Sequence, residues 1–301
     1  MAKVVVTGGA GFIGSRLVGA LLKRDDEVHA IDSYAAGKRA DRIHAGATYH
    51  EADIRDVEKI KSILVGAIYV FHAAALPRVQ YSIENPVETF SVNAGGTIAL
   101  LEAAAKAGVK RFIFSSSAAV YGDETTMPLQ EDMRVKPMSP YALHKLIGEE
   151  ACKLSSRIYG LQTVSLRYFN VYGPGFDPEG PYGLVVGKFV TQRKNGQPFS
   201  IAGDGTHTRD YVHVDDVVRA NLLAAESANV GAGEVINIGT GKETSVSDIA
   251  RIVGGPTVSI EARIEPARAC ADNTRAYKLL AWEPTIVFED GIEALKKEFG
   301  L

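Results

Sequence analysis

A tyrosine and a lysine four positions apart are the first chemical feature of this 301-residue chain. In a helix, the side chains of Tyr141 and Lys145 would lie on one face. A nearby ammonium favours ionisation of a phenol, so the pattern predicts a tyrosine that can take a proton from an alcohol. Ser117 lies 24 residues before Tyr141 and adds a hydroxyl that can hold the same alcohol. Together the three side chains predict removal of hydride from a carbinol carbon, although Tyr-x-x-x-Lys alone is common in helices.

A glycine-rich turn near the start of the chain predicts a phosphate-binding loop. The apolar run at residues 3–6 is typical of a strand, and a helical pattern follows the glycines. Gly8, Gly11 and Gly14 fit G-x-x-G-x-x-G, and Gly9 offers G-x-G-x-x-G as the alternative reading. Glycines here allow a tight turn and bring a pyrophosphate close to the helix N-terminus. The segment therefore predicts a βαβ dinucleotide site.

An aspartate indicates which dinucleotide binds. Asp32 ends the next strand pattern, 18 residues after Gly14, where an acid is expected to accept hydrogen bonds from the adenosine ribose. A carboxylate there would repel a 2′-phosphate, so the sequence favours NAD over NADP. Two alternatives stay open. Asp32 could be a solvated strand-end residue, and Lys38 and Arg39 could screen a phosphate.

Asp53 has two interpretations. It follows a short strand pattern at residues 48–50 and precedes a helical pattern at 57–64. It could contact the adenine side of the cofactor, or it could cap the helix in the manner of an N-terminal aspartate.

Composition excludes several classes of protein. The net charge of -3 gives no reason to expect nucleic acid or an anionic membrane as partner. No apolar stretch is long enough for a membrane span, and the first strand pattern at Lys3 leaves no room for a signal peptide. Cys152 and Cys270 are too few for a disulfide framework and lack metal-ligand spacing. We expect a cytoplasmic protein with no bound metal, in which Cys152 serves packing.

Strand and helix patterns alternate through the first half of the chain. The strand patterns lie at residues 3–6, 27–32, 48–50, 67–72, 111–115 and 163–167. The helical patterns lie at residues 12–22, 57–64, 86–107 and 141–159. This order predicts an α/β fold with a doubly wound parallel sheet of Rossmann type, in which ligands bind at the carboxyl ends of the strands.

The composition of the sequence changes after residue 170, where a loop rich in glycine and proline begins. We expect residues 1–170 to form an NAD-binding domain that carries the catalytic residues. Residues 171–301 are expected to form mainly a smaller α/β substrate-binding lobe, from which some segments could return to the main sheet. The helices at 86–107 and 141–159 are also suited to pairing with their copies in a homodimer.

Several signatures stand together in this chain. They are Thr7–Gly14, Asp53–Asp56, His72–Ala75, Asn93, Ser115–Gly122, Tyr141-x-x-x-Lys145, Arg167–Asn170 and residues 203–216. On these motifs the chain resembles the extended short-chain dehydrogenases/reductases, in the nucleotide-sugar epimerase/dehydratase group, over essentially its whole length. Within that group the likeness is greatest to the 4-epimerases of UDP-hexoses. The resemblance implies NAD as cofactor and a UDP-sugar as substrate.

The resemblance also implies a role for each matching residue. Tyr141 would be the acid/base at the sugar 4-hydroxyl, Lys145 would bind the nicotinamide ribose and lower the tyrosine pKa, and Ser117 would bind the same sugar oxygen. The implied cofactor-binding residues are Gly8, Gly11, Phe12, Ile13, Asp32, Ser33, Gly37, Lys38, Asp53, Ile54, Ala73, Ala74, Ala75, Asn93, Ser115, Tyr141, Lys145 and Tyr168. The implied substrate-binding residues are Ser117, Asn170, Leu184, Phe199, Ile201, Arg209, Tyr211, Arg263 and Ala269.

The substrate residues divide by the part of the UDP-sugar that they would meet. Asn170 would lie near the diphosphate, and Arg209 would grip it with a guanidinium fork. Leu184, residues 199–202 and Tyr211 would cradle the uridine. Arg263 has two interpretations, a second phosphate-binding arginine or a surface residue. Ala269 would stand beside the 2-substituent of the hexose.

The residues after Ser117 favour one reaction of the group. The dehydratases carry Thr-Asp-Glu here, because eliminating water needs an extra acid and base. This chain has Ser117 followed by Ala118 and Ala119, and the methyl groups of the two alanines cannot transfer protons. We therefore expect reversible inversion at C4 of UDP-glucose and UDP-galactose through a 4-keto intermediate, with NAD bound throughout. The small Ala269 predicts that UDP-N-acetylhexosamines are accepted as well.

Other functions remain open from the sequence. An epimerase of the same group that acts on a uronic acid or a deoxysugar is the nearest alternative. A reductase that consumes NAD(P)H is another. A non-catalytic NAD-sensing relative would be expected to lose Tyr141 or Lys145, and this chain keeps both.

Overall fold

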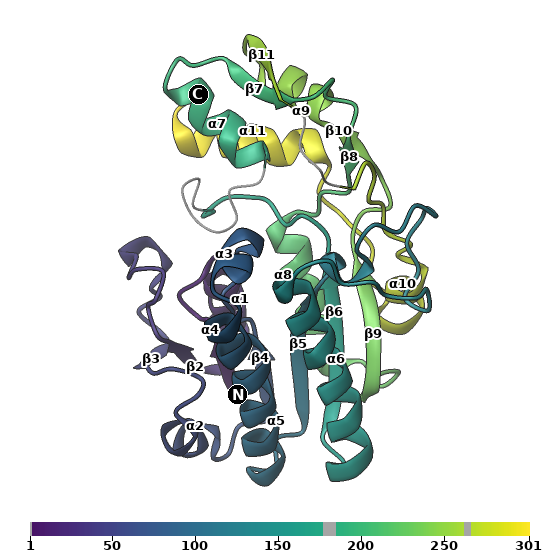
Figure 1. Cartoon of the computed structure of the whole chain (residues 1–301). Helices are drawn as coiled ribbons and strands as arrows, with labels where there is room; N and C mark the ends of the chain where they lie inside the picture. Colours follow the sequence, from purple (N-terminus) through teal and green to yellow (C-terminus); the bar gives the residue numbers. More distant parts are fainter. Residues whose placement is uncertain (1, 177–184, 262–265) are drawn as a thin grey trace.

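A seven-stranded parallel sheet forms the body of the protein in a computed structural model that describes residues 2–176, 185–261 and 266–301 (Figure 1). The strand order is β3-β2-β1-β4-β5-β6-β9. The strands are β1 (Lys3–Thr7), β2 (Glu27–Asp32), β3 (Thr48–Glu51), β4 (Tyr69–His72), β5 (Arg111–Ser117), β6 (Gln162–Tyr168) and β9 (Ala232–Ile238). The predicted α/β fold with a doubly wound parallel sheet is confirmed.

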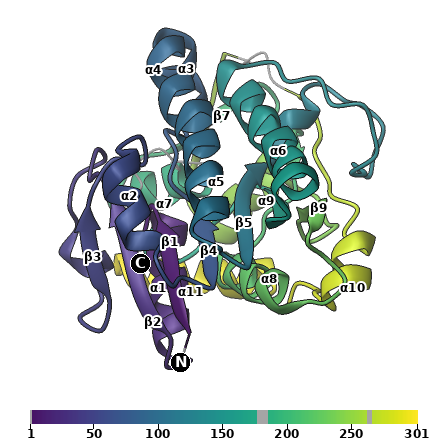
Figure 2. The same ribbon diagram turned by 90° about the horizontal axis from the view of Figure 1, so that it is seen from below.

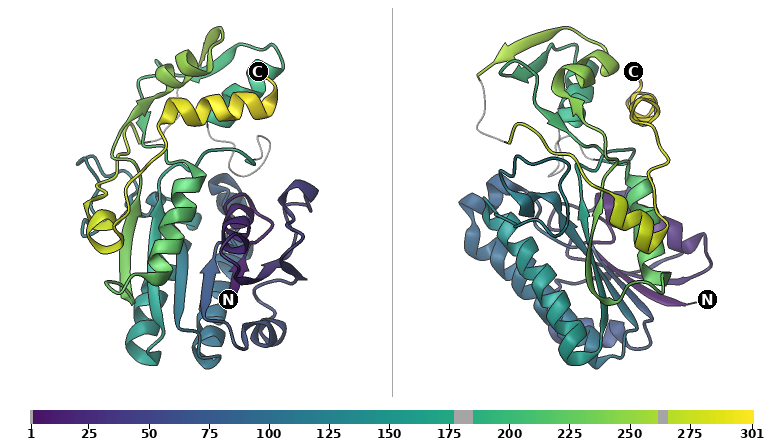
Figure 3. Two further views of the ribbon diagram at one scale, coloured as in Figure 1. Left: turned by 180° about the vertical axis from the view of Figure 1, so that it is seen from behind. Right: turned by 90° about the vertical axis from the view of Figure 1, so that its right-hand side faces the viewer.

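Helices cover both faces of the sheet, so the body has three layers (Figures 2 and 3). One face carries α2 (Val57–Leu64), α5 (Thr97–Lys106) and α6 (Pro140–Tyr159), and the other carries α1 (Phe12–Leu22) and α8 (Val214–Glu226). Because β-strand side chains alternate between faces, β1 divides its own side chains between the layers. Val5 packs under the α5 layer, whereas Val4 and Val6 pack under α1. The sheet is thus buried on both sides, as parallel sheets require.

The carboxyl ends of β1 and β4 open the crevice where a ligand is expected. The chain runs from β1 outward to β2 and β3, then crosses back to β4 and continues to β5 and β6. The strand order therefore reverses between β1 and β4, and ligands bind at such a switch point. Thr7 and His72 are paired in register at this point, and Ser117 is paired with Tyr168 at the end of β5.

A smaller lobe lies above the carboxyl edge of the sheet (Figure 1). It contains α7 (Val185–Lys194), β7 (Phe199–Ala202), β8 (Thr208–Arg209), β10 (Thr244–Ser245), α9 (Val246–Val253), β11 (Thr257–Ile260) and α11 (Phe288–Phe299). Two segments beyond residue 170 belong to the body instead, because β9 pairs with β6 and α8 packs on α1. A further helix, α10 (Thr274–Leu280), packs against β9 and α8. A domain boundary at residue 170 stays a prediction.

The expected long helical stretch at residues 86–107 is present, but it contains an internal π-helical turn that the sequence did not predict. The segment contains α4 (Pro86–Phe90), a π-helical turn at Ser91–Gly96, and then α5, and a separate short helix, α3 (Val79–Glu84), precedes it. The π-helical turn includes Asn93, whose side chain bonds the backbone of Leu76 across the site. Such turns inside helices are frequent at functional sites.

Two kinds of feature are missing from the described ranges. No helix among them is both long enough and apolar enough to cross a membrane. No three His, Cys, Asp or Glu side chains in the same ranges are grouped so as to hold a metal ion. Both cysteines are buried and unpaired, and burial raises the pKa of Cys152 to about 12.

Candidate active site

The structure brings the three predicted catalytic residues together at the junction of β5 and α6. Ser117 ends β5, and Tyr141 lies in the first turn of α6, where Pro140 and the capping hydroxyl of Ser139 begin the helix. The Tyr141 hydroxyl is hydrogen bonded with Ser117. One turn later, Lys145 Nζ donates to the backbone oxygen of Ser115 at 2.7 Å. A phenol, a hydroxyl and an ammonium thus share one site.

The surroundings of Tyr141 and Lys145 within the protein shift their pKa values in directions that the sequence did not predict. Burial raises the pKa of Tyr141 to about 12, and the hydrogen bond with Ser117 only partly opposes this rise. Burial also lowers the pKa of Lys145 to about 8. The expected lowering of the tyrosine pKa by the lysine is therefore wrong for the protein alone. The ammonium is directed to Ser115 and lies 5.8 Å from the centroid of the Tyr141 ring.

The β1–α1 turn is shaped to admit a large anion. Gly8 has a φ of +68°, and a Cβ on this residue would lie 2.7 Å from the backbone nitrogen of Ala74. A Cβ on Gly14 would lie 2.0 Å from the carbonyl oxygen of Gly8. Only glycine fits either position. Gly11 is the N-cap of α1 and supplies no side-chain cap, so the first turn, with Phe12 and Ile13, presents its backbone N–H groups as a pyrophosphate site requires.

Asp32 lies beside this turn and orders it. Its Oδ2 accepts a hydrogen bond from Ala10 N at 2.9 Å, and its Oδ1 accepts one from Tyr34 N at 2.8 Å. The two cations that could have favoured a 2′-phosphate have other contacts. Lys38 Nζ lies 4.7 Å from the centroid of the Tyr34 ring, and Arg39 forms a two-pronged ion pair with Asp41.

A neighbouring aspartate, and not Asp53, caps the N-terminus of α2. The N-cap of α2 is Asp56, whose carboxylate accepts from Lys59 N at 3.3 Å. Asp53 instead pairs with Arg55 through both carboxylate oxygens and stays partly exposed near the end of β3. The helix-capping interpretation of Asp53 therefore does not apply, and its contact with the cofactor stays a prediction.

The remaining cofactor candidates surround the crevice. Ala73 and Ala74 follow β4, and their N–H groups bond Thr7 O and Thr7 Oγ1 at 3.1 and 3.3 Å, which leaves Ala75 in the loop beyond. Asn93 is buried and holds the backbone of Leu76, so its side chain shapes this loop. Ile54 is buried in the body, whereas Ser33 and Gly37 are exposed beyond β2.

Ser115 and Tyr168 form one buried hydroxyl network. Ser115 Oγ lies 3.1 Å from Tyr168 OH, which also accepts a hydrogen bond from Asn221 Nδ2 at 2.8 Å. Burial raises the pKa of Tyr168 to about 12, so the phenol stays neutral. The network fixes the end of β6 against β5 and α8 beneath the crevice.

The end of β8 and the residues after it carry a candidate diphosphate residue, Arg209, and a candidate uridine residue, Tyr211. Asn170 Nδ2 donates to Asp210 O at 2.8 Å, so Asn170 lies beside the Arg209–Tyr211 segment. Arg209 is partly exposed, and its Nη1 donates to Thr208 O at 2.8 Å. Tyr211 is buried against Tyr172 and Phe288. The structure thus brings Asn170, Arg209 and Tyr211 into one region.

The other candidate substrate-binding residues differ in how far their side chains are exposed. The side chain of Phe199 is completely buried and stacks on Phe189 with ring centroids 4.7 Å apart, so only its backbone could meet a nucleotide. Ile201 lies farther along the same strand and is partly exposed. Ala269 packs against the same small cluster as Ala118, next to Ser117. Leu184 and Arg263 lie outside the described residues.

Sequence reasoning missed a buried carboxylate that ties the substrate segments together. Asp210 is completely buried and accepts hydrogen bonds from Thr240 N and Oγ1, Gly241 N and Ala271 N. It therefore joins the Arg209–Tyr211 segment to the loop after β9 and to the segment of Ala269. Its place between a phosphate-type arginine and an aromatic residue was the only signal in the sequence.

The chain is similar in sequence and in structure to known epimerases. Residues 4–239 match the NAD dependent epimerase/dehydratase family. The UDP-glucose 4-epimerase of Mycolicibacterium smegmatis is 38% identical, with 96% of each chain covered. The crystal structure of UDP-glucose 4-epimerase from Thermotoga maritima with UDP-glucose gives a TM-score of 0.93 at 38% identity, over 99% of this chain and 98% of that chain. UDP-N-acetylglucosamine 4-epimerase from Methanobrevibacter ruminantium, in complex with UDP-N-acetylmuramic acid, gives 0.93 at 35% identity, with the same coverage.

Proposed function

The chain belongs to the NAD dependent epimerase/dehydratase family, and from that premise we propose that it interconverts UDP-glucose and UDP-galactose. The reaction inverts C4 of the hexose reversibly, through a 4-keto sugar. The enzyme is thus an NAD-dependent nucleotide-sugar 4-epimerase, an isomerase of galactose metabolism.

One observation carries this proposal. Ser117, Tyr141 and Lys145 meet at the end of β5, and the two residues that follow Ser117 are alanines. Ala118 and Ala119 begin the short 3-10 turn Ala118–Tyr121 and have no group that could move a proton. The site therefore has the groups for oxidation and reduction at one carbinol carbon, and the two positions after Ser117 supply no extra acid or base for loss of water. Epimerisation needs no more than the groups that are present.

The residues around the crevice fit NAD. The glycine turn and the first turn of α1 would hold the pyrophosphate, Asp32 would accept from the adenosine ribose, and Lys145 would hold the nicotinamide ribose. When bound, NAD would supply the hydride acceptor for C4 and, in its oxidised form, a positive charge beside the phenol. Asp53, Ile54, the alanines at 73–75, Asn93, Ser115 and Tyr168 would line or shape this site.

The chain's own residues handle the proton. Ser117 orients the sugar 4-oxygen, and Tyr141 takes the hydroxyl proton as C4 is oxidised. Because burial alone keeps Tyr141 protonated, it can act as the base only with a positive charge close by. Tyr141 returns the proton to the 4-oxygen when the 4-keto sugar is reduced on its opposite face. Arg209, Asn170 and Tyr211 would hold the UDP end while the sugar turns over.

A broader choice of sugar has its own support. Ala269 and Ala118 pack against one small apolar cluster beside Ser117, and neither side chain extends beyond a methyl group. We extend the proposal to UDP-N-acetylhexosamines, because this corner leaves room for an acetamido group at C2. A uronic acid or a deoxysugar stays the alternative substrate, and Leu184 and Arg263 stay candidate contacts.

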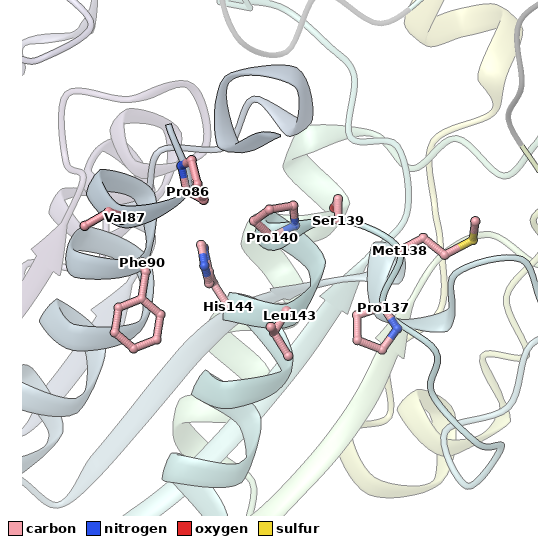
Figure 4. A pocket seen from close by; sticks show the side chains of 9 residues that line it. All are labelled: Pro86, Val87, Phe90, Pro137, Met138, Ser139, Pro140, Leu143 and His144. Atoms are coloured by element: carbon pink, nitrogen blue, oxygen red, sulfur yellow. The ribbon is translucent and has the colours of Figure 1, made fainter. Parts of the chain in front are cut away.

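The outer surface of α4, α5 and α6 suits a second copy of the chain. Exposed apolar side chains gather on these helices, namely Val87, Phe90, Ile98, Leu143, Leu154 and Ile158. A groove of about 610 Å³ lies among them, between α4 and the start of α6 (Figure 4). Exposed apolar patches often mark protein–protein interaction sites. A homodimer in the cytoplasm is therefore part of the proposal. Phe90→Glu should shift the protein to monomer in light scattering, and Tyr277→Glu, on α10, is the control.

An isotope experiment tests the reaction. UDP-galactose with deuterium at C4 is incubated with the protein in ordinary water, and the product is analysed by NMR and mass spectrometry. The proposal predicts UDP-glucose that keeps deuterium at C4, because hydride leaves and returns within one site. Protium at C4 would indicate proton abstraction instead, and a 4-keto-6-deoxy product would indicate a dehydratase. Either result would overturn the proposal.

A further inference from the structure

A buried ion pair lies one helical turn beyond Lys145. Glu149 Oε1 accepts hydrogen bonds from Arg167 Nε at 2.9 Å and from Ser116 Oγ at 2.5 Å, and its Oε2 accepts from Arg167 Nη2 at 2.7 Å. The side chains of the pair are 0% and 3% exposed. Burying two charges gives little net stability compared with apolar residues of the same volume. Stability alone therefore does not explain the pair.

The pair completes a set of contacts that align α6 with β5. Residues 115–117 of β5 each bond to a different turn of α6. Ser117 is bonded with Tyr141, and the carbonyl of Ser115 accepts from Lys145. The middle serine donates to the carboxylate of the ion pair. Because Arg167 is also the register partner of that serine on β6, the pair fastens both strands to the helix that carries the catalytic groups.

The pair is also the main source of fixed charge near Lys145. His72, on β4, is completely buried between two threonine hydroxyls with its pKa lowered to about 3, so it is neutral. Burial lowers the pKa of His144, and burial raises that of Tyr141, so both are neutral near pH 8. Burial lowers the pKa of Lys145, and the negative charge of Glu149 works against that fall.

The positive partner, Arg167, has a further contact besides Glu149. The guanidinium carbon of Arg167 lies 4.7 Å from the centroid of the Tyr121 ring, and Tyr121 OH donates to Asn237 Oδ1 on β9. Burial raises the pKa of Tyr121 to about 12, so this phenol is neutral too. The ionised groups facing Lys145 from α6 and β6 are thus the two members of the pair.

On the basis of the proposed function, we propose that Glu149 and Arg167 are positioning residues that set the charge of Lys145. The carboxylate stabilises the ammonium of Lys145, and the guanidinium limits that effect and locks the carboxylate in place. The two residues should therefore act on Lys145 in opposite directions. A merely structural pair would give no such opposition, because loss of either member would loosen the same packing.

The test follows the titration of Lys145 directly. Lysine is labelled with ¹³C at Cε, and the Lys145 signal is assigned by its loss in Lys145→Met. Its midpoint is then compared in the protein as purified, in Glu149→Gln and in Arg167→Gln. We expect the midpoint to fall by about 0.5–1 pH unit in Glu149→Gln and to rise in Arg167→Gln. Ser116→Ala keeps both charges and should leave the midpoint unchanged.

Opposite shifts support the proposal, and equal shifts or none would overturn it. If one single variant does not fold, the direction in which the Lys145 midpoint shifts in the other variant still tests the proposal. If neither folds, the double variant that removes both charges should return the midpoint close to that of the unsubstituted protein. The alkaline limb of kcat should move with the midpoint while KM stays unchanged. Since the titration needs no substrate, a failure here is distinct from a failure of the epimerase assignment.

Discussion

Replacing Tyr141 with phenylalanine separates proton transfer from every other property of the site. The substitution removes one oxygen and keeps the ring in the first turn of α6. Proton transfer by a positioned side chain contributes about 10²–10⁴-fold in rate. In activation free energy this corresponds to about 3–5 kcal/mol. The hydroxyl's visible contribution to stability is its hydrogen bond with Ser117, worth about 1 kcal/mol. Catalysis should therefore suffer far more than folding.

The assay measures conversion of UDP-galactose by NMR, alongside urea unfolding and the NAD content of the purified variant. We expect kcat to fall by about 10²–10⁴-fold, with unfolding free energy within about 1 kcal/mol and NAD retained. Ser117→Ala is the matched comparison, because it removes the partner hydroxyl and leaves the phenol in place. Turnover of Tyr141→Phe within a few-fold of the unsubstituted protein would refute Tyr141 as acid and base.

Three further predictions rest on single positions. Activity should fall as pH rises through about 8, because Lys145 then loses its charge. The free energy of unfolding, in contrast, should rise as the pH rises. The pKa of Lys145 is lowered from 10.5 to about 8 in the folded chain, so the unfolded chain binds more protons between these values. The unfolding free energy, relative to Lys145→Met in NAD-free protein, should rise by up to about 3 kcal/mol from pH 8 to 10.5 in urea titrations, and a constant difference would contradict this. Gly14→Ala places a Cβ against Gly8 O and should cost about 1–3 kcal/mol with loss of bound NAD. Gly95→Ala should cost little, because its Cβ would make only an ordinary contact, 3.8 Å from Phe90 O, and equal effects of the two substitutions on thermal unfolding would be evidence against the tight turn. Ala269→Tyr should abolish conversion of UDP-N-acetylhexosamines and spare UDP-glucose, and equal losses in kcat/KM would exclude the gate.

The sequence was most informative where one residue type has one physical use. The turn at Gly8 and Gly14 leaves no room for a Cβ, and its glycine spacing, with the apolar run before it and the helical pattern after it, located the first strand, the loop and the first helix. The predicted helix at residues 57–64 has the bounds that the structure shows. Ser117, Tyr141 and Lys145 were brought together from spacing and strand ends alone.

The sequence failed where the outcome depends on packing between distant segments. The π-helical turn inside the predicted helix at residues 86–107 was missed because apolar periodicity does not show such a turn, which here accompanies the bonds of Asn93 to Leu76. The pKa of Tyr141 was predicted in the wrong direction because burial and the path of the Lys145 side chain decide it. Asp210 could not be recognised, since its four donors come from two segments far along the chain.

The other buried carboxylate shows an intermediate case. Glu149 follows Lys145 by one helical turn, a spacing that puts both on one face of α6, yet the sequence analysis did not single it out. Its partner Arg167 was visible only as part of a motif. The ion pair exists because β6 lies beside β5 in the sheet, and that neighbourhood is a property of the fold.

The central claim is tested most directly by adding UDP-galactose to purified protein without supplementary NAD and following the sugar anomeric signals by NMR. We expect UDP-glucose to appear and to approach a constant ratio with UDP-galactose, with no net reduction of cofactor. UDP-galactose that stays unchanged, even after NAD is added, would contradict it.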